Sequence, residues 1–248
     1  MARVFITGSA DGLGQLAGKQ LIDEGHRVVL HARNAERARY AQDKVPGAEN
    51  VLLGDLFSME ETKKLASDVN AMGRFDAIIH NAGVYMVSKR LTFAVNSIAP
   101  YVLTCLIQKP KRLVYLSSGM HLQGNPNLRD TSWDAGVSYS DSKLHVVILS
   151  MAVARKWPDV YSNAVDPGWV PTKMGGLNAP DTLEKGIETQ VWLAVSNEDK
   201  AKVSGRYFHH KKERHYLSVA SDYTVQDKFL AMCERISGIQ FPNAEHKQ

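Results

Sequence analysis

Tyr139 and Lys143 lie four residues apart, at the start of an apolar stretch and downstream of a strand-like run that ends in Ser117 and Ser118. Residues at this spacing project from the same face of a helix. A free phenol has a pKa of about 10, and a neighbouring ammonium group favours its ionised form. The pair therefore predicts a proton-transfer site in which Lys143 lowers the pKa of Tyr139.

The same spacing occurs three more times, at Tyr40/Lys44, Tyr85/Lys89 and Tyr207/Lys211, so spacing alone identifies nothing. The Tyr40 pair falls in an amphipathic stretch and is expected on the surface. The Tyr207 pair runs into the polar segment 209–215, which we expect to be a solvated loop. That segment lacks acidic or cysteine partners at metal-ligand spacing, so no metal site is predicted. Tyr85 is the main rival of Tyr139, because it follows the turn Asn81-Ala82-Gly83, although no serine-bearing strand leads into it.

Short apolar runs recur along the chain, and they are continuous rather than alternating, which is typical of parallel strands covered on both faces. These runs are 4–7, 28–32, 51–53, 77–80, 113–116 and 162–165. The amphipathic stretches expected to be helices are 12–25, 34–44, 58–73, 92–108, 137–157, 181–196 and 222–237. The alternation predicts a doubly wound α/β fold with a mostly parallel sheet, helices on both faces and ligands beyond the carboxyl ends of the strands.

Length and composition fit one soluble domain spanning residues 1–248, with 44% apolar and 23% charged residues. A net charge of +4 spread along the chain does not favour binding to nucleic acid. Cys105 and Cys233 lie in apolar helical patterns, as expected for reduced thiols of a cytoplasmic protein. The chain starts almost directly on its first strand and has no apolar run long enough for a membrane anchor.

A glycine turn directly follows the first strand and precedes the first helix, and it comprises Thr7, Gly8, Ser9, Gly12, Leu13 and Gly14. Glycine permits positive φ and close approach of the backbone to a ligand, while free N–H groups at a helix start attract a pyrophosphate. The alternative is a tight turn with close helix packing. The context between a strand and a helix favours a dinucleotide site.

The end of the second strand bears on the choice of nucleotide. An acidic residue there would accept the ribose hydroxyls of NAD, but this chain has Ala32 and Arg33. The Arg33 guanidinium suits a 2′-phosphate, so NADP(H) is favoured and NAD(H) stays open. The alternative is that Arg33 is a solvated residue at a helix start.

Taken in order, these motifs resemble the short-chain dehydrogenase/reductase family in its single-domain form, with a Rossmann-type fold. The glycine turn has the spacing of that family, and Asn81-Ala82-Gly83 resembles its Asn-Asn-Ala-Gly element, with His80 in place of the first Asn. The resemblance implies the catalytic residues Asn96, Ser118, Tyr139 and Lys143. It also implies the cofactor-binding residues Thr7, Gly8, Ser9, Gly12, Leu13, Gly14, Arg33, Asp55, Leu56, Asn81, Ala82, Gly83, Tyr139, Lys143, Pro167, Gly168, Val170 and Thr172, and no metal.

In the family, hydride transfer between nicotinamide and a carbonyl carbon is matched by proton delivery to the oxygen. The resemblance implies that Tyr139 transfers this proton and that Ser118 contacts the substrate oxygen. It also implies that Lys143 holds the nicotinamide ribose and that Asn96 positions a bridging water. The closing segment 204–208 is most similar to the retinol-dehydrogenase-like branch. The rival functions are a nucleotide-binding redox sensor without turnover and, less favoured, a sugar-nucleotide epimerase.

This sequence departs from the family pattern before Tyr139, because 21 positions separate it from Ser118. The extra residues belong to a long loop at 119–136, which with a second loop at 169–182 is expected to border the substrate. Ser117 remains an alternative to Ser118, since only one of two successive strand residues faces a given side. The apolar side chains Trp133, Trp169, Met174 and Leu177 predict a hydrophobic aldehyde, ketone or alcohol as substrate.

The expected helix 137–157 carries two apolar stripes. One comprises Leu144, Val147, Ile148 and Met151, and the other Val146, Leu149, Val153 and Trp157. The second stripe is explained either by packing against the helix at 92–108 or by a homodimer interface.

Overall fold

The computed structural model describes residues 1–128 and 131–242, which build one eight-stranded sheet in the order β3-β2-β1-β4-β5-β6-β7-β8. The strands are β1 (Arg3–Ile6), β2 (Arg27–Ala32), β3 (Asn50–Leu53), β4 (Ala77–His80), β5 (Arg112–Leu116), β6 (Tyr161–Asp166), β7 (Arg206–His209) and β8 (Lys212–Glu213). Strands β1 to β7 pair in parallel, and β8 pairs antiparallel with β7. The predicted mostly parallel, doubly wound α/β fold is confirmed, and the chain crosses over between β1 and β4, where such folds bind ligands.

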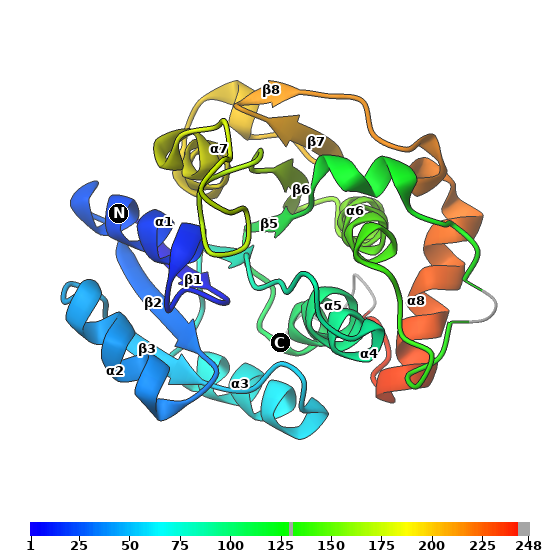
Figure 1. Cartoon of the computed structure of the whole chain (residues 1–248), viewed down its shortest axis with the longest axis horizontal. Coiled ribbons are helices and arrows are strands. Elements are labelled where there is room, and N and C mark those ends of the chain that lie inside the picture. The colour runs from blue at the N-terminus through cyan, green and yellow to red at the C-terminus, as the bar shows by residue number, and fades with distance from the viewer. Residues whose placement is uncertain (129–130, 243–248) are drawn as a thin grey trace.

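Helices cover both faces of the sheet (Figure 1). Helices α1 (Gly12–Asp23), α2 (Ala35–Lys44) and α7 (Leu183–Val195) pack on one face. The other face carries α3 (Met59–Ala71), α4 (Lys89–Phe93), α5 (Ala99–Leu106), α6 (Tyr139–Lys156) and α8 (Tyr223–Ser237). Two apolar cores result, one on each side, because the continuous apolar strands send side chains alternately to either face.

The second apolar stripe of α6 is buried within this chain. Val146, Leu149 and Val153 are at most 3% exposed. Helix α8 packs along α6, where the Phe229 ring lies 5.2 Å from the ring of His145. Since α8 covers this surface, the stripe needs no subunit contact to explain its apolar character.

The segment 209–215 is exposed from residue 211 onward, as expected, but it forms part of a short hairpin rather than an irregular loop. Tyr207 and Phe208 are buried in β7, and a two-residue turn connects β7 to β8. The turn residues His210 and Lys211 have φ values of 49° and 57°, as in a type I′ hairpin. Because the strand is short and its turn lacks Gly and Asn, the pattern that identifies hairpins in a sequence is missing.

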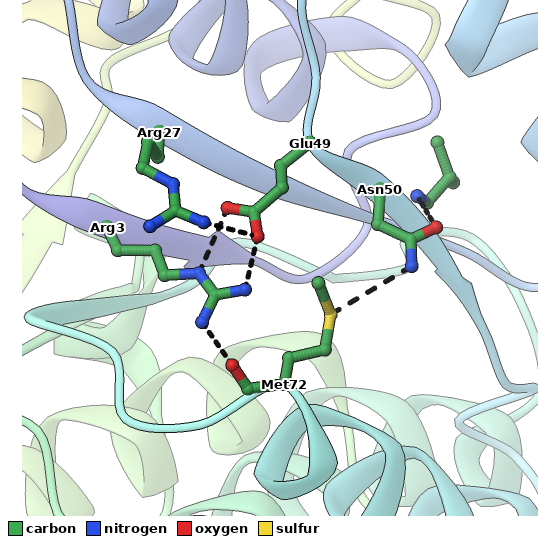
Figure 2. Close-up of polar contacts among 6 residues, drawn as sticks. Arg3, Arg27, Glu49, Asn50 and Met72 are labelled. Carbon is green, nitrogen blue, oxygen red and sulfur yellow. Dashed lines mark hydrogen bonds and ion pairs between the residues drawn. The ribbon is translucent and has the colours of Figure 1, made fainter.

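Polar contacts hold the amino-terminal ends of three strands together, at the edge of the sheet opposite the glycine turn. Glu49, just before β3, pairs with Arg3 of β1 and with Arg27 of β2, whose Nη2 lies 2.9 Å from Glu49 Oε1 (Figure 2). Burial raises the pKa of Glu49, but the hydrogen bonds and charges of the two arginines outweigh burial and lower it overall. Arg3 also donates to the carbonyl of Met72, which ties the end of α3 to β1.

Both cysteines are free thiols, Cys233 buried and Cys105 half-buried, as predicted. No helix within the described ranges combines the length and apolarity needed to traverse a bilayer. Of the expected substrate loop at 119–136, positions 129–130 lie outside the described residues.

Candidate active site

The predicted site residues follow the carboxyl ends of the central strands. The glycine turn follows β1, Asn81 follows β4, Ser118 follows β5 and Pro167 follows β6. Parallel strands end at the same edge of a sheet, so these segments share one edge, with α6 beside them (Figure 1).

The glycine turn presents a concave stretch of backbone at the start of α1. Gly8 and Gly12 have φ values of 60° and 57°. A Cβ on Gly8 would come within 2.7 Å of Ala82 Cα, whereas a Cβ on Gly12 would meet nothing within 4 Å. Asp11 does not cap α1 with its side chain, and the N–H groups of residues 12–14 have no acceptor within the described chain. Gly8 is therefore needed for packing, while Gly12 leaves free N–H groups and space that fit a pyrophosphate.

His31 holds this turn in place, and sequence reasoning missed it. Its Nδ1 accepts from the Gly8 N–H at 2.9 Å, and its Nε2 lies 2.8 Å from the Gly54 carbonyl oxygen, which together fix the tautomer with the proton on Nε2. Burial lowers the pKa of His31 to about 4, so the ring is neutral at pH 7. A polar residue inside an otherwise apolar strand was the signal that could have revealed it.

Other residues that were expected to contact the nucleotide make hydrogen bonds inside the protein instead. The Ser9 side chain is fully buried, where it donates to the Ile6 carbonyl and accepts from the His31 N–H. The Ser9 N–H also donates to the His31 carbonyl at 3.1 Å, so neither group is left for a ligand. Asn81 donates to the carbonyl oxygens of Thr7 and Gly8, both at 2.9 Å. The Thr7 hydroxyl accepts from the Ala82 N–H at 3.1 Å. These contacts lock the turn after β1 to the turn after β4.

The end of β2 carries no carboxylate toward the ribose. Ala32 is buried, and Arg33 is exposed without an ion pair or side-chain hydrogen bond inside residues 1–128 and 131–242. A neighbouring cluster surrounds Asp11, which pairs with Arg37 and lies 3.1 Å from Lys173 Nζ. After β3, Asp55 is half-buried with its Oδ1 accepting from the Phe57 N–H at 2.9 Å, and Leu56 is buried in the core.

A capping box places Tyr139 at the first position of α6. Ser138 accepts from the Asp141 N–H at 3.1 Å, and Asp141 accepts from the Ser138 N–H at 3.0 Å. The Ser118 hydroxyl lies beside the Tyr139 phenol and interacts with it. The Ser117 hydroxyl instead donates to the Lys143 carbonyl at 2.9 Å inside the protein. Of the two serines, Ser118 is the one that shares the site with Tyr139.

The electrostatics of Tyr139 differ from the expectation. Burial raises its pKa to about 12, and the charge of Asp166 and the neighbouring Tyr85 add to that rise, while Ser118 acts in the opposite direction. Lys143 Nζ lies 5.4 Å from the centre of the Tyr139 ring. Burial lowers the pKa of Lys143 to about 8, against the opposing effect of Asp166. The prediction that the pKa of Tyr139 is lowered is therefore wrong for the protein chain itself, because the cost of burying a phenolate outweighs the contacts that favour it.

Asn96 lies in a π-helix, Ala94–Ile98, between α4 and α5, where a single helix was expected over 92–108. Its amide pairs with both backbone groups of Val84, at 2.8 and 3.0 Å, and donates to the Ser142 hydroxyl at 3.0 Å. A Cβ on Gly83 would lie 3.4 Å from Lys143 Nζ and 3.6 Å from Asn96 Oδ1, so both groups converge on this glycine. Lys143 Nζ also donates to the Leu116 carbonyl at 2.9 Å. Such π-bulges are frequent at functional sites.

The rival tyrosine belongs to the same site. The Tyr85 ring lies 4.7 Å from the Tyr139 ring in an edge-on arrangement, and its side chain is 39% exposed. Lys89, its partner in the sequence pattern, is exposed at the start of α4. The two tyrosines share one environment, but only Tyr139 has Ser118 and a buried lysine beside it.

Comparison with known proteins decides the family. A family model described as short chain dehydrogenase matches residues 2–183. An uncharacterized oxidoreductase of Emericella nidulans is 44% identical over 98% of this chain and 99% of its own length. The chain belongs to the short-chain dehydrogenase family. Human retinol dehydrogenase 13 is 25% identical over 98% of this chain and 87% of its own, so the likeness to that branch holds at a distance.

Solved structures agree with this short-chain dehydrogenase fold. An uncharacterized protein from Mycobacterium paratuberculosis superimposes with a TM-score of 0.83 at 21% identity, covering 98% of this chain and 95% of that one. NADPH-bound carbonyl reductase from chicken fatty liver superimposes with a TM-score of 0.69 at 19% identity, covering 87% of this chain and 99% of that one. As a member of this family, the protein is an oxidoreductase that acts on CH–OH or C=O groups.

The segment after β6 completes the site of this short-chain dehydrogenase. Gly168 has a φ of 85°, and its N–H donates to Asp166 Oδ1 at 3.0 Å. Pro167 is half-buried and Val170 is buried, while the Thr172 hydroxyl accepts from the Gly175 N–H at 3.2 Å. Sequence reasoning missed Asp166, the only carboxylate among the described residues that contributes to the pKa of both Tyr139 and Lys143. Its position at the carboxyl end of β6, directly before Pro167, was the signal that could have revealed it.

Proposed function

We propose that this short-chain dehydrogenase uses NADP(H) to interconvert a carbonyl compound and its alcohol, with Tyr139 as general acid and base. The observation that carries the proposal is the convergence of Tyr139, Ser118 and Lys143 beside a glycine turn with free N–H groups. A bound nicotinamide supplies or accepts the hydride in such a reaction. The protein must then place the carbonyl and move one proton to or from its oxygen.

The protonation states favour Tyr139 as a donor. With a pKa of about 12, its phenol is neutral at pH 7 and holds the proton that a reduced carbonyl oxygen requires. Ser118 is placed to donate a hydrogen bond to the same substrate oxygen. Lys143, with a pKa of about 8, is largely charged at pH 7 and can stabilise the phenolate when the proton leaves. Asn96 and Ser142 fix the backbone and helix around this lysine.

Arg33 supports the choice of NADP(H). It is the free guanidinium at the end of β2, with buried Ala32 rather than a carboxylate before it, which suits a 2′-phosphate. The carbonyl reductase with which the chain shares its fold was solved with NADPH. The proposed substrate is a small aldehyde, ketone or alcohol, and the proposed location is the cytoplasm, where thiols such as Cys105 stay reduced.

The alternative is a protein that binds NADP(H) as a redox sensor without turnover. The assembled group of Tyr139, Ser118 and Lys143 argues against it, since a sensor would not require a proton donor beside a buried lysine. Turnover with any member of a carbonyl panel separates the two functions.

The test uses Tyr139→Phe, with Tyr85→Phe as the matched control on the neighbouring ring. NADPH oxidation is followed against aliphatic, aromatic and retinoid carbonyls, and NADPH binding is measured by calorimetry. We expect Tyr139→Phe to lower kcat by at least about a hundredfold, the usual range for loss of a general acid, while NADPH still binds. Tyr85→Phe should retain turnover. If activity were retained in Tyr139→Phe and lost in Tyr85→Phe, the proposal would be wrong, and Tyr85 would be the proton donor.

A further inference from the structure

Asp166 ends β6 with a carboxylate that is only half satisfied. Its Oδ1 accepts from the Gly168 N–H at 3.0 Å. Its Oδ2 has no hydrogen-bond donor within residues 1–128 and 131–242, and the side chain is 19% exposed. A Cβ on Gly119 would lie 3.2 Å from Oδ2, so the oxygen lies against the residue that follows Ser118. An acceptor therefore lies open beside the serine that would contact the substrate oxygen.

The polar groups around Asp166 are mostly engaged elsewhere. His209 Nδ1 lies 3.7 Å from Oδ2 but 3.2 Å from the backbone oxygen of Asp166. His121 donates from Nδ1 to the Ser118 carbonyl at 2.8 Å and accepts at Nε2 from the Leu217 N–H. Lys143 Nζ donates to the Leu116 carbonyl. None of these donors directly reaches the open oxygen.

Tyr207 adds a second unpaired group on the same face of the sheet. It lies on β7 and pairs in register with Ala164, two residues before Asp166. Its ring is tilted against the ring of His121, with ring centres 4.6 Å apart. Its side chain is 3% exposed, and its hydroxyl has no hydrogen-bond partner among the residues that the structure describes. An unpaired buried hydroxyl is costly, so Tyr207, together with the open oxygen of Asp166, indicates that a polar ligand is missing on this face.

We propose that Asp166 is a substrate-binding residue, which accepts a hydrogen bond from an N–H or O–H group next to the reacting carbonyl. This inference rests on the proposed function of the same site. The substrates it selects are hydroxy ketones, amido ketones and related neutral or cationic compounds. Substrates with a carboxylate in that place are excluded, because two anions would face each other without a counter-ion between them.

The substrate proposed here carries a polar group next to its carbonyl, whereas the sequence predicted a hydrophobic aldehyde, ketone or alcohol. Trp169, Met174 and Leu177 are 57%, 45% and 96% exposed on their loop. Trp133 packs against Phe57 with ring centres 6.3 Å apart. These apolar side chains are thus largely exposed or packed on one another, while polar groups lie near Ser118: the Tyr139 phenol, the His121 ring and the Asp166 carboxylate.

The test compares three aryl ketones of similar size, namely 2-hydroxyacetophenone, propiophenone and phenylglyoxylate, with NADPH as reductant. They differ in carrying a hydroxyl, a methyl or a carboxylate beside the carbonyl group. We expect kcat/KM for 2-hydroxyacetophenone to exceed that for propiophenone by about 10- to 100-fold, the size of a hydrogen bond to a charged acceptor. Phenylglyoxylate should be the poorest substrate of the three.

Asp166→Ala is expected to bring the ratio for the hydroxy and methyl ketones to within about twofold of one, and to raise the relative rate with phenylglyoxylate. Asp199→Ala, which removes a fully exposed carboxylate on the short helix at Asp199–Ala201, should keep the wild-type ratio. If Asp166→Ala does not fold, Asp166→Asn keeps the shape of the side chain without its charge. It should raise the rate with phenylglyoxylate relative to the other two ketones.

The outcomes distinguish this inference from the function on which it rests. Wild-type protein that binds NADPH but reduces none of the three ketones, nor the broader carbonyl panel, would overturn the proposed function. Reduction without preference for the hydroxy ketone, or a preference that persists in Asp166→Ala, would leave the proposed function intact and overturn the role of Asp166.

Discussion

Three of the four buried histidines around the site have strongly lowered pKa values, and they should make the protein less stable in mild acid. Burial lowers the pKa of His31 to about 4, of His80 to about 3 and of His145 to about 4. His31 supports the glycine turn, His80 stacks on Tyr115 just before the Asn81 turn, and His145 lies one turn beyond the catalytic end of α6. A histidine in the unfolded chain has a pKa of about 6.5. Below that pH, these three histidines bind protons in the unfolded chain but stay neutral in the folded protein.

The magnitude follows from these shifts. Each folded pKa is depressed, so the stability that each histidine contributes is fully present above about pH 6.5 and is lost as pH falls toward the folded pKa. Between pH 7 and pH 5.5, each group should cost about 1.2 kcal/mol, and the three together nearly 4 kcal/mol, or roughly a third of a typical domain's stability. Carboxylates, with unfolded pKa values of about 4, add little in this window.

Urea unfolding followed by circular dichroism at pH 7.0 and 5.5, at constant ionic strength, measures this loss. His80→Asn replaces the titrating ring by a neutral amide and should remove about a third of it. His215→Gln, at an exposed position, is the matched control and should change nothing. The free energy of unfolding could instead fall by less than about 1 kcal/mol between pH 7.0 and 5.5, or fall as much in His80→Asn as in the wild type. Either result would show that these rings are not neutral and buried in solution.

Two further predictions concern the nucleotide and the sheet. Arg33→Asp should raise the ratio of the Kd for NADPH to that for NADH by about 10- to 100-fold, since a charged hydrogen bond to the 2′-phosphate is lost. Arg39→Asp, on the exposed part of α2, controls for charge, and an unchanged ratio in the Arg33 variant would refute the preference for NADP(H). Glu49→Gln should lower the free energy of urea unfolding by about 1 to 2 kcal/mol, because Arg3, with a side chain 14% exposed, loses its partner. Kd for NADPH should stay unchanged, and an undiminished unfolding free energy would mean that this pair contributes nothing.

The fold could be predicted from the sequence because its central strands are buried on both faces. Such strands appear as continuous apolar runs, and all six predicted runs became strands β1 to β6 with shifts of at most one residue at their ends. Strand β7 escaped prediction because Arg206 and His209 flank only two buried residues. Pairing with β6 stabilises this segment, and tertiary pairing of that kind leaves no periodic pattern in so short a run.

The site could be predicted in its parts but not in its supporting contacts. The glycine turn, Ser118, Tyr139 and Lys143 share one edge of the sheet because the alternation of strands and helices makes the strands parallel, so that their carboxyl ends lie together. His31 and Asp166 act through neighbours distant in the chain, at Gly54 and Gly119. No local spacing connects such residues, so only the folded structure reveals their roles.

The pKa of Tyr139 shows most clearly what spacing cannot supply. Four residues of helix place Lys143 on the same face, yet its ammonium is turned to the Leu116 carbonyl, and Asp166 supplies a negative charge that no motif contains. Burial then decides the sign of the shift. In the proposed reaction, a neutral phenol beside a buried ammonium gives up its proton when charge appears on the substrate oxygen, and the lysine stabilises the phenolate that remains. The chemistry that the sequence predicts therefore depends less on a lowered resting pKa than on an environment that favours charge separation only during the reaction.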